Sequence, residues 1–300
     1  MMPRSIALSG ASGLLGSALG PALTTAGWSV RPLVRRAAGA DEIRWSPAEN
    51  TINIDALAGV SAAVHLAGEP IAEGRWTADK KERIRKSRIL GTRLLSESLA
   101  RLPVRPEVLV SASAIGIYGD RGDEILDEDS SLGTDFLSEV GRDWEAATAP
   151  ASEAGIRVVH LRFGIILAPD GGALPRMVKP FLLGAGGPIG NGRQWMSWVA
   201  IEDAVRIVLE ALQRPEMRGA INAVAPDPVR NADFASQLGE VLHRPALVPA
   251  PAFALRLLFG EMADAALLAS QRVLPARLTA LGFEFRHPTL PVALRAVLDR

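Results

Sequence analysis

Three glycines near the start of the chain have the spacing of a phosphate-binding turn. Gly10, Gly13 and Gly16 follow the apolar run at 6–8 at intervals of three residues. In such turns the first glycine lets the chain reverse, the second lets a phosphate approach the backbone, and the third allows close helix packing. Apolar residues at helical spacing over 14–26 place a helix N-terminus beside the turn, which favours an anion such as a pyrophosphate. The pattern predicts a dinucleotide site; the alternative is that these are ordinary turn glycines. The residues expected to contact the dinucleotide are Gly10, Ala11, Ser12, Gly13, Leu14 and Leu15.

The end of the next apolar segment, at 28–34, indicates which dinucleotide binds. NAD sites usually carry a carboxylate there for the ribose 2′-hydroxyl. This chain continues instead with Arg35 and Arg36 and has no carboxylate before Asp41. Because guanidinium groups suit a 2′-phosphate, we expect NADP(H) as the cofactor. The alternative is a pair of exposed arginines in an arginine-rich chain. The run HLAG ends a further strand, and its Leu66, Ala67 and Gly68 are expected to lie against the adenosine–pyrophosphate side of the cofactor.

The composition excludes several other functions. Lys+Arg and Asp+Glu number 33 each in the 300 residues, so a general nucleic-acid or anionic-membrane surface is not expected. The chain has no cysteine, which rules out disulfides, thiolate nucleophiles and cysteine-bound metals. The four histidines are far apart and form no metal-binding pair, so we expect structural histidines and no metal site.

The ends of the chain give expectations about its location. The first strand begins within a few residues of Met1, which leaves no room for a signal peptide. The apolar stretch 251–274 is interrupted by Arg256, Glu261 and Asp264 and is therefore not expected to span a membrane. We expect a soluble, cytoplasmic protein that binds a small-molecule substrate. The sequence does not indicate its oligomeric state.

Short apolar runs alternate with longer helical patterns, as in a doubly wound parallel sheet. The predicted fold class is α/β, a Rossmann-type sheet with a smaller C-terminal substrate lobe. Residues 1–244 are expected to form the cofactor-binding domain, with 165–200 as an insertion that joins a helical lobe at 245–300. The expected strands are 4–9, 28–34, 43–46, 61–67, 107–113, 156–162 and 219–224. The expected helices are 14–26, with a kink at Pro21, 78–101, 136–154, 202–213 and 231–242.

The segment 78–101 has a strongly amphipathic helical pattern. A helix over this range would turn one apolar side toward the sheet and one basic side toward water. The residues expected to face the sheet are Ile84, Ile89, Leu90, Leu94, Leu95 and Leu99, and those expected to face water are Lys80, Lys81, Arg85 and Lys86. The basic run is interpreted as a solvated face rather than a nucleic-acid patch.

Longer motifs indicate a family. The glycine turn, HLAG and SASAIGIYGD at 111–120 resemble the extended short-chain dehydrogenase/reductase superfamily. Over essentially its whole length the chain resembles the atypical "epimerase family" subgroup, which carries a C-terminal domain of unknown function and is sometimes labelled a cell-division inhibitor. The motifs are HLAGEPIAEGRW (65–76), KSRILGT (86–92), GAGGPIGNGRQWMSW (184–198), APDPVRNADF (225–234) and QRVLPARLTALGFEF (271–285). The resemblance implies a Rossmann fold and NADP(H) binding, with cofactor contacts at Arg36, Leu66, Ala67, Arg88 and Ile166. It does not imply a particular reaction, because none is established for the subgroup.

The resemblance fails at the superfamily's acid–base residues. Typical members place a lysine four residues after a tyrosine on one helix, so that the ammonium lowers the pKa of the phenol. Here Leu137 and Gly141 stand at those positions. The only tyrosine, Tyr118, is followed four residues later by Gly122. The usual proton-transfer pair is therefore missing.

Three polar residues are candidates to replace the missing pair. Ser113, near the end of the fifth strand, is expected to bind substrate or nicotinamide, or else to close a turn. Tyr118 is a displaced acid or a packing residue. Glu69, directly after HLAG, reaches the nicotinamide or lies on a helix start. Trp76, Trp195 and Trp198 form a pocket wall or core; we expect Trp76 in the pocket and Trp198 in the core.

The segment 192–198 argues against a nucleotide-sugar substrate. Superfamily members that bind such sugars follow a G-x-Q turn with Arg-Asp-Phe, whose arginine clamps the diphosphate; here Met196 replaces that arginine and Trp198 the phenylalanine. The asparagine expected three residues after Arg162 is Ile165. The sequence favours a smaller, more apolar carbonyl or alcohol between Trp76, Met196 and the loop 184–192, although Arg193 or Lys179 could restore the charge.

Two functions remain open at this point. The first is an NADP(H)-dependent oxidoreductase or epimerase with a rearranged acid–base set, which the cofactor motif and the substrate lobe favour. The second is a non-catalytic NADP(H)-binding sensor or regulatory protein, which the loss of both the tyrosine and the lysine favours.

Overall fold

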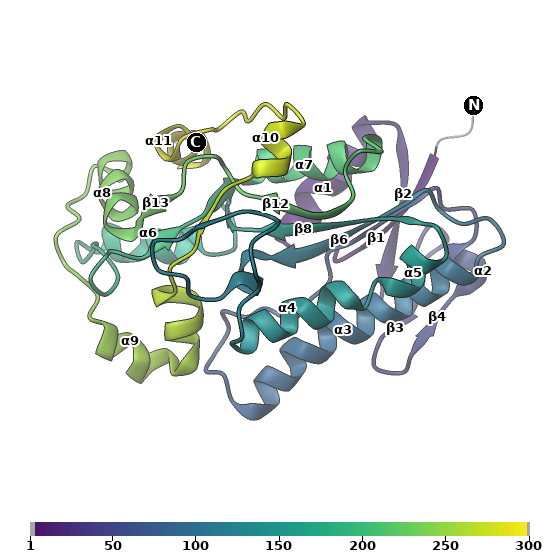
Figure 1. The fold of residues 1–300 in the computed structure, drawn as a ribbon, viewed down its shortest axis with the longest axis horizontal. Helices are drawn as coiled ribbons and strands as arrows, with labels where there is room; N and C mark the ends of the chain where they lie inside the picture. The colour runs from purple at the N-terminus through teal and green to yellow at the C-terminus, as the bar shows by residue number, and fades with distance from the viewer. Residues whose placement is uncertain (1–3, 299–300) are drawn as a thin grey trace.

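An eight-stranded sheet forms the centre of the structure (Figure 1). The computed structural model describes residues 4–298. All neighbouring strands of the sheet are parallel except β3 and β4. In spatial order the strands are β12 (Gly219–Ala223), β8 (Arg157–Phe163), β6 (Val108–Ala114), β5 (Ala62–His65), β1 (Arg4–Ser9), β2 (Trp28–Val34), β3 (Ile43–Ser46) and β4 (Thr51–Ile52).

The chain order of the strands reverses between β1 and β5, because the chain first builds outward through β2 to β4 and then returns to add β5, β6, β8 and β12. Such a reversal opens a crevice at the carboxyl edge of a parallel sheet, where ligands of this fold bind. The fold therefore places the loops that follow β1, β5 and β6 beside one another.

Helices cover both faces of the sheet. Alternate strand residues enter different cores, so that Ile6 and Leu8 pack in one apolar cluster and Ala7 in another. On the first face lie α1 (Leu14–Thr25) and α7 (Ile201–Gln213). On the second face lie α2 (Ile54–Leu57), α3 (Ala78–Arg101), α4 (Phe136–Ala146) and α5 (Ala149–Glu153).

Two helix predictions need correction. The predicted helix 136–154 is wrong as one element, because it ends at Ala146 and a short second helix starts at Ala149, with Pro150 in its first turn. In α3 the bounds agree with the prediction, but Leu90 is 40% exposed, and Lys80 is buried because it pairs with Glu69.

The helix α1 continues through Pro21. The residue before a proline is disfavoured in the helical region because its Cβ meets the proline ring. Gly20 precedes Pro21 and has no Cβ, which lowers the cost of a proline inside this helix. The hydroxyl groups of Thr24 and Thr25 donate to the carbonyls of Gly20 and Pro21 in the same turn.

Three two-stranded ribbons, which the sequence patterns did not predict, lie outside the central sheet. They pair β9 (Ile165–Leu167) with β11 (Trp198–Ala200), β10 (Trp195–Met196) with β13 (Val229–Arg230), and β7 (Ile125–Leu126) with β14 (Arg272–Val273). The last ribbon ties the C-terminal segment to the loop after β6. That loop begins with the 3₁₀ turn η1 (Ile115–Tyr118).

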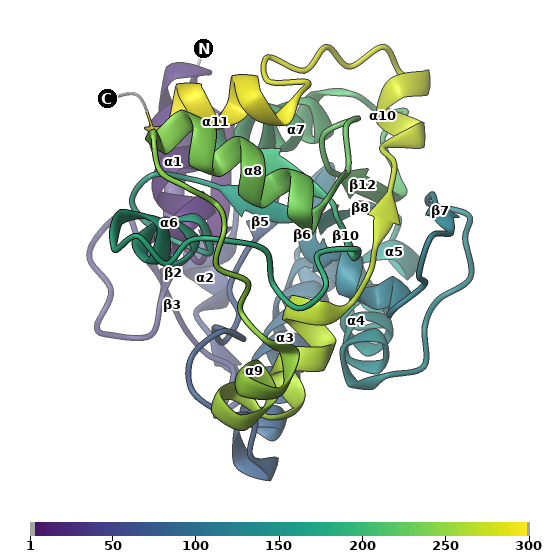
Figure 2. The ribbon, with the colours of Figure 1, turned by 90° about the vertical axis from the view of Figure 1, so that its left-hand side faces the viewer.

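The C-terminal segment spreads over several parts of the molecule (Figure 2). The helix α11 (Leu290–Leu298) packs with α8 (Asn231–Leu242) and α6 (Leu174–Leu182) around Trp198. The helix α10 (Ala276–Ala280) adds Leu278 to the core on the face of the sheet that α1 and α7 cover. The helix α9 (Ala252–Phe259) and the π-helical turn η2 (Ala263–Leu268) contribute Phe259 and Leu267 to a cluster that includes Trp76 and Met262. Within residues 4–298 no helix combines the length and the apolar character needed to cross a membrane.

Candidate cofactor site and active site

The glycine turn after β1 has a different requirement at each glycine. Gly10 has a φ of 69°, and a Cβ there would lie 2.8 Å from the backbone carbon of Leu66. A Cβ at Gly16 would collide with the carbonyl oxygen of Gly10, so only glycine lets α1 pack this closely on the turn. Gly13 has ordinary extended backbone, and a Cβ there would meet only the carbonyl oxygen of Gly10, at 3.2 Å. The face at Gly13 is therefore open to a ligand.

The helix N-terminus at this turn has neither a side-chain cap nor an acidic residue in its first turn. Its N-cap residue is Gly13. By contrast, the hydroxyl of Thr77 caps α3 by accepting from the amide of Lys80. The positive end of the α1 dipole and its amide groups suit a pyrophosphate, so the residues of the turn fit the expected dinucleotide.

Arg35 and Arg36 follow β2 and are both exposed. The Nη1 of Arg36 donates to Glu42 Oε2 at 2.7 Å, and its Nη2 donates to Glu42 Oε1. The side chain of Arg35 makes no hydrogen bond or ion pair with any residue between 4 and 298. Two guanidinium groups therefore lie at the end of β2. That of Arg35 has no partner among residues 4–298, and that of Arg36 is paired with Glu42.

A buried serine–histidine pair supports the backbone after β5. The Oγ of Ser9 accepts from the amides of Leu66 and Ala67 at 3.1 and 3.3 Å, and lies 2.7 Å from His65 Nδ1. Because both lone pairs of the serine oxygen accept from these amides, its proton is assigned to the bond with Nδ1, which places the imidazole proton on Nε2. Burial lowers the pKa of His65 to about 4, so the ring is neutral at physiological pH. Ser9 and His65 therefore fix the segment predicted to contact the cofactor.

The catalytic candidate Glu69 is held against α3. Its carboxylate accepts from Lys80 Nζ at 2.8 Å and lies 3.6 Å from Arg83. The hydrogen bond from Lys80 lowers the pKa of Glu69, so the carboxylate is ionised at neutral pH. The side chain keeps 31% of its surface exposed. Glu69 is thus a partly accessible anion.

Arg88 lies beneath the same loop. Its guanidinium donates to the carbonyl of Glu69 at 3.1 Å and stacks over the ring of Trp144. A Cβ at Gly68 would lie 3.4 Å from its Cζ. Burial lowers the pKa of Arg88 to about 10, which still leaves it charged at neutral pH. Arg88 therefore supplies a cation beside the HLAG loop.

The segment around Ile166 also approaches the glycine turn. Ile166 belongs to β9. The loop that follows β9 lies against Leu14: a Cβ added at Gly171, or one added at Gly172, would lie 2.8 Å from the end of the Leu14 side chain. The start of α1 and the β9 loop thus lie together, as the cofactor contacts implied by the resemblance require.

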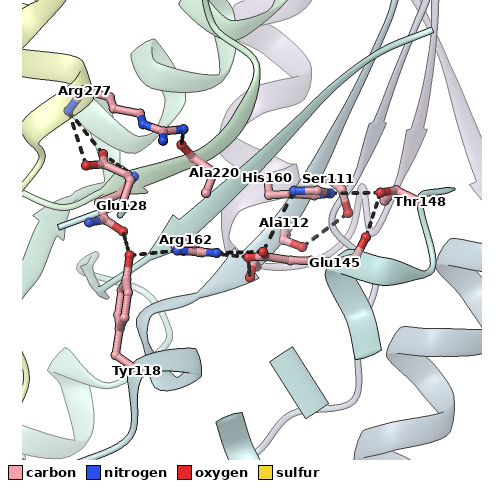
Figure 3. Close-up of polar contacts among 12 residues, drawn as sticks. Ser111, Ala112, Tyr118, Glu128, Glu145, Thr148, His160, Arg162, Ala220 and Arg277 are labelled. Atoms are coloured by element: carbon pink, nitrogen blue, oxygen red, sulfur yellow. Dashed lines mark hydrogen bonds and ion pairs between the residues drawn. The ribbon is translucent and has the colours of Figure 1, made fainter. Parts of the chain in front are cut away.

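Ser113 and Tyr118 belong to one buried polar network at the carboxyl edge of the sheet. Figure 3 shows its part formed by Tyr118, Arg162 and Glu145. The hydroxyl of Ser113 donates to Glu145 Oε1 at 2.7 Å. The Nε and Nη2 of Arg162 donate to the two carboxylate oxygens of Glu145, each at 2.8 Å, and its Nη1 donates to the Tyr118 hydroxyl at 2.9 Å. Tyr118 donates in turn to Asn222 Oδ1 at 2.7 Å. Both candidate hydroxyl groups therefore donate their protons to protein acceptors.

The electrostatics of this network oppose proton transfer from Tyr118. Burial raises the pKa of the Tyr118 phenol, and the positive charge of Arg162 offsets only part of that effect. Burial opposes the ionisation of Glu145, but the hydrogen bonds and charge of Arg162 outweigh it and lower the pKa of the carboxyl. The network thus holds an ionised Arg162–Glu145 pair and a neutral tyrosine.

Sequence reasoning missed Glu145 and Glu128. Glu128 is buried and accepts from the amides of Asn222 and Arg277, which joins the C-terminal segment to β12. Its pKa is raised by burial. One available signal was Arg162, a charged residue in a strand expected to be buried, which needs a buried partner.

The positions of the missing Tyr–Lys pair are filled by apolar packing. A Cβ at Gly141 would lie 3.0 Å from Cβ and Cγ1 of Ile117 in η1. Leu137 lies in the apolar cluster of Trp76, Val140 and Met262. Trp76 is 8% exposed and donates from Nε1 to the carbonyl of Ile71. The cluster surrounds the position at which the superfamily has its tyrosine.

The other tryptophans divide between core and surface. Trp198 is fully buried and donates to the carbonyl of Asp227, as expected for core. Trp195 donates to Asp123 and stacks with Arg230 and Arg272. Met196 is buried in the cluster around Trp198 rather than in that of Trp76. Trp76 and Met196 therefore lie in different apolar clusters, and the substrate pocket expected between them stays a prediction.

Comparison with known proteins identifies relatives along the whole chain. The model of the NAD dependent epimerase/dehydratase family matches residues 6–223, and a model described as Domain of unknown function (DUF1731) matches residues 250–297. The chain is 43% identical over 290 residues to Epimerase family protein Mb2239 of Mycobacterium bovis, covering 96% of each chain.

Solved structures agree with this family. The crystal structure of human epimerase family protein SDR39U1 with NADPH matches with a TM-score of 0.91 and 32% identity, over 99% of this chain and 100% of that chain. A nucleoside-diphosphate sugar epimerase from Corynebacterium glutamicum matches with a TM-score of 0.83 and 40% identity, over 99% of this chain and 58% of that chain. The predicted family and Rossmann-type fold are confirmed. The chain belongs to the NAD-dependent epimerase/dehydratase family, and it carries the C-terminal domain of unknown function that matches residues 250–297.

Proposed function

We propose that the chain is an NADP(H)-dependent oxidoreductase or epimerase that acts on a small, non-nucleotide carbonyl or alcohol without a Tyr–Lys pair. One observation carries the cofactor part: the open backbone at Gly13 lies beside the uncapped N-terminus of α1, at the reversal of strand order. An anion of the size of a pyrophosphate complements that site. The human relative described with NADPH supports the same cofactor for this chain.

The remaining cofactor contacts follow from the arrangement of the loops. Arg35 and Arg36 at the end of β2 would hold the 2′-phosphate. Leu66, Ala67 and Gly68 would lie along the adenosine–pyrophosphate side, since Ser9 already fixes their backbone. Arg88 and Ile166 would contact the cofactor from α3 and β9. NADP(H) would supply or accept a hydride when bound.

The substrate side is inferred to be apolar. Leu137 replaces the usual tyrosine inside a cluster that also contains Trp76, Phe136 and Phe259. A surface hollow of about 450 Å³ lies beside this cluster and is lined by Trp76, Phe136, Lys81, Arg85 and Glu261, among others. The two cations of the hollow are already paired, Lys81 with Glu261 and Arg85 with Glu139 and Asp143. The rings of Trp76 and Phe136 therefore favour a small aromatic substrate over a diphosphate. Of the three catalytic candidates, Glu69 is a partly exposed anion, whereas Ser113 and Tyr118 are buried.

The division of the chain into two parts and the cellular location of the protein stay predictions. Residues 1–244 would bind the cofactor, and 165–200 with 245–300 would form the substrate side. A cytoplasmic location and a small-molecule partner are part of this proposal.

A second function deserves equal testing, that of a non-catalytic NADP(H) sensor. The contact between Gly141 and Ile117 favours it, because no acid–base pair fits at the usual positions. The engagement of Ser113 and Tyr118 by Glu145 and Asn222 favours it as well.

Cofactor binding and turnover separate these functions. Calorimetric titration of the wild type should give tighter binding of NADPH than of NADH. Arg36→Ala should lose roughly tenfold in NADPH affinity, the lower end for a charge-assisted contact, because Arg36 is exposed. Equal binding of both cofactors by the wild type would refute the NADP(H) assignment. NADPH oxidation is then followed with a broad carbonyl library. Tight NADPH binding with no turnover on any carbonyl favours the sensor.

A further inference from the structure

The loop between β2 and β3 closes on itself through Arg36 and Glu42. Both Nη atoms of Arg36 donate to the carboxylate of Glu42, and Nη1 also donates to the carbonyl of Ala37 at 2.8 Å. Glu42 accepts in addition from the amide of Gly39 at 2.8 Å. The carboxylate is therefore anchored by two groups of its own loop, directly before β3 begins at Ile43.

This pairing occupies the Nη1–Nη2 edge of Arg36, which is one of the two edges through which a guanidinium can hold a phosphate. A guanidinium binds a carboxylate or a phosphate through the same parallel pair of N–H donors. Glu42 is the less exposed partner, with 20% of its side chain accessible against 66% for Arg36. Its pKa is lowered by the hydrogen bond from Arg36, so it is an anion at neutral pH. A 2′-phosphate that approaches Arg36 thus either displaces a fixed negative group from the Nη1–Nη2 edge or binds the Nε side next to that group.

We propose that Glu42 is a built-in competitor for the 2′-phosphate, which sets how strongly the protein prefers NADPH over NADH. Glu42 holds Arg36 when no phosphate is present and gives up or shares the guanidinium when NADPH binds. Arg35, whose side chain has no partner among residues 4–298, is the guanidinium that meets the phosphate without displacing a carboxylate. This inference rests on the proposed NADP(H) binding and names a residue that regulates it.

The test is the affinity of Glu42→Gln for both cofactors. Glutamine keeps an oxygen for the amide of Gly39 and removes only the charge. We expect NADPH to bind about two- to fivefold more tightly, the range of an exposed ion pair, and NADH to bind as in the wild type. The matched control is Asp41→Asn, which removes one negative charge from the neighbouring, exposed position. It should change neither affinity by as much as twofold.

A double-mutant cycle shows whether Glu42 acts through Arg36. In an Arg36→Ala background, Glu42→Gln should leave the NADPH affinity unchanged. Weaker NADPH binding by Glu42→Gln would overturn the inference, because Glu42 would then orient Arg36 toward the phosphate. An equal gain in NADPH affinity in Asp41→Asn, or an equal gain in NADH affinity in Glu42→Gln, would overturn the inference, because the effect would then come from the overall charge of the loop. If the wild type binds neither cofactor, the proposed function itself fails, whereas a wild type that prefers NADPH and is unaffected by Glu42→Gln refutes only the role of Glu42.

Discussion

Ile117 fills the space beside Gly141 in which the superfamily's catalytic lysine would begin. A Cβ at Gly141 would lie 3.0 Å from two side-chain atoms of Ile117, and a Cβ at Gly116 would lie 3.5 Å from Leu137. The turn η1 is therefore packed directly on α4 at both positions of the missing pair. The absence of the pair is a feature of the packing as well as of the sequence, and restoring it would require η1 to move.

This contact predicts an unusual response to alanine. Glycine to alanine inside a helix normally stabilises by about 1 kcal/mol. At Gly141 the added methyl meets Ile117, and overpacking of this kind costs about 1–3 kcal/mol. Gly141→Ala should therefore lower the free energy of unfolding, or at best leave it unchanged, in urea denaturation.

Gly91 in α3 provides the matched control. A Cβ there lies at 3.4 Å from Trp45 and 3.5 Å from His65, which is ordinary contact. Gly91→Ala should stabilise the protein or be neutral. Equal stabilisation by both substitutions would mean that η1 is not packed against α4 as described.

The glycine turn predicts a separation of binding from folding. Gly13 has φ −79° and ψ 175°, which a valine also adopts, and only the carbonyl of Gly10 lies nearby. Gly13→Val should therefore keep the stability within about 1 kcal/mol of the wild type, the cost of a poorer helix cap, while it blocks the pyrophosphate. Calorimetry should detect no NADPH binding.

Gly16→Ala serves as the contrasting variant, since its Cβ collides with the carbonyl of Gly10. It should lower the melting temperature clearly, whereas Gly13→Val should not. Normal NADPH binding by Gly13→Val would show that the turn is structural and would remove the main support for the dinucleotide site.

Tyr118 and Ser113 should respond in opposite ways to removal of their hydroxyl groups. Tyr118→Phe leaves buried donor and acceptor groups of Arg162 and Asn222 without a partner, at a cost of about 1–3 kcal/mol in stability. It should keep most of any turnover, because the phenol is fully buried and already donates its proton to Asn222. Ser113→Ala leaves Glu145 bound to Arg162, so its stability should fall less, but any turnover should fall more.

The readouts are urea denaturation and initial rates at saturating NADPH. A loss of several orders of magnitude in rate for Tyr118→Phe alone would reverse this ranking and identify Tyr118 as a relocated general acid.

Much of the fold could be predicted from the sequence because its signals are local. The strands at 4–9, 28–34 and 43–46 agree with the structure residue by residue, since apolar runs between turn residues mark buried parallel strands. The helix 78–101 was equally clear from its period. The cofactor candidates lie on loops that follow these strands, so the order of elements alone places them at one edge of the sheet.

The catalytic region was harder to predict because its contacts are distant in sequence. Arg162 pairs with Glu145 from another element, and Glu128 binds backbone amides at Asn222 and Arg277. No periodicity indicates such partners. The helix predicted at 136–154 divides where Pro150 lacks an amide donor and where the hydroxyl of Thr148 bonds the carbonyl of Glu145, features that a hydrophobic pattern does not record.

The buried His65 predicts a pH dependence of stability. Its pKa is about 4 in the folded protein and near 6.5 in the unfolded chain, so the unfolded state binds more protons between these values. Stability should therefore fall as the pH decreases from 6.5 to 4, with His65 accounting for up to about 3 kcal/mol. Urea denaturation of the wild type and of His65→Gln at pH 7 and pH 4.5 measures this: the variant should lose less stability on acidification. Parallel losses in both proteins would mean that His65 is protonated in the folded state.

The apolar surroundings of Leu137 predict that nucleotide-diphosphate sugars do not bind the substrate side. Met196 stands where nucleotide-sugar enzymes have a diphosphate-clamping arginine, and it is buried with its Sδ 3.2 Å from Asn231 Nδ2, so it presents no charge to a ligand. Arg193 is the exposed cation that could replace the clamp, and the Corynebacterium glutamicum relative is described as a nucleoside-diphosphate sugar epimerase, so the question needs a direct measurement. Calorimetric titration of the NADP-loaded protein with UDP-glucose should give no heat of binding at micromolar concentrations, and Arg193→Ala should behave identically. Micromolar binding that Arg193→Ala abolishes would refute the apolar substrate and make Arg193 the diphosphate clamp.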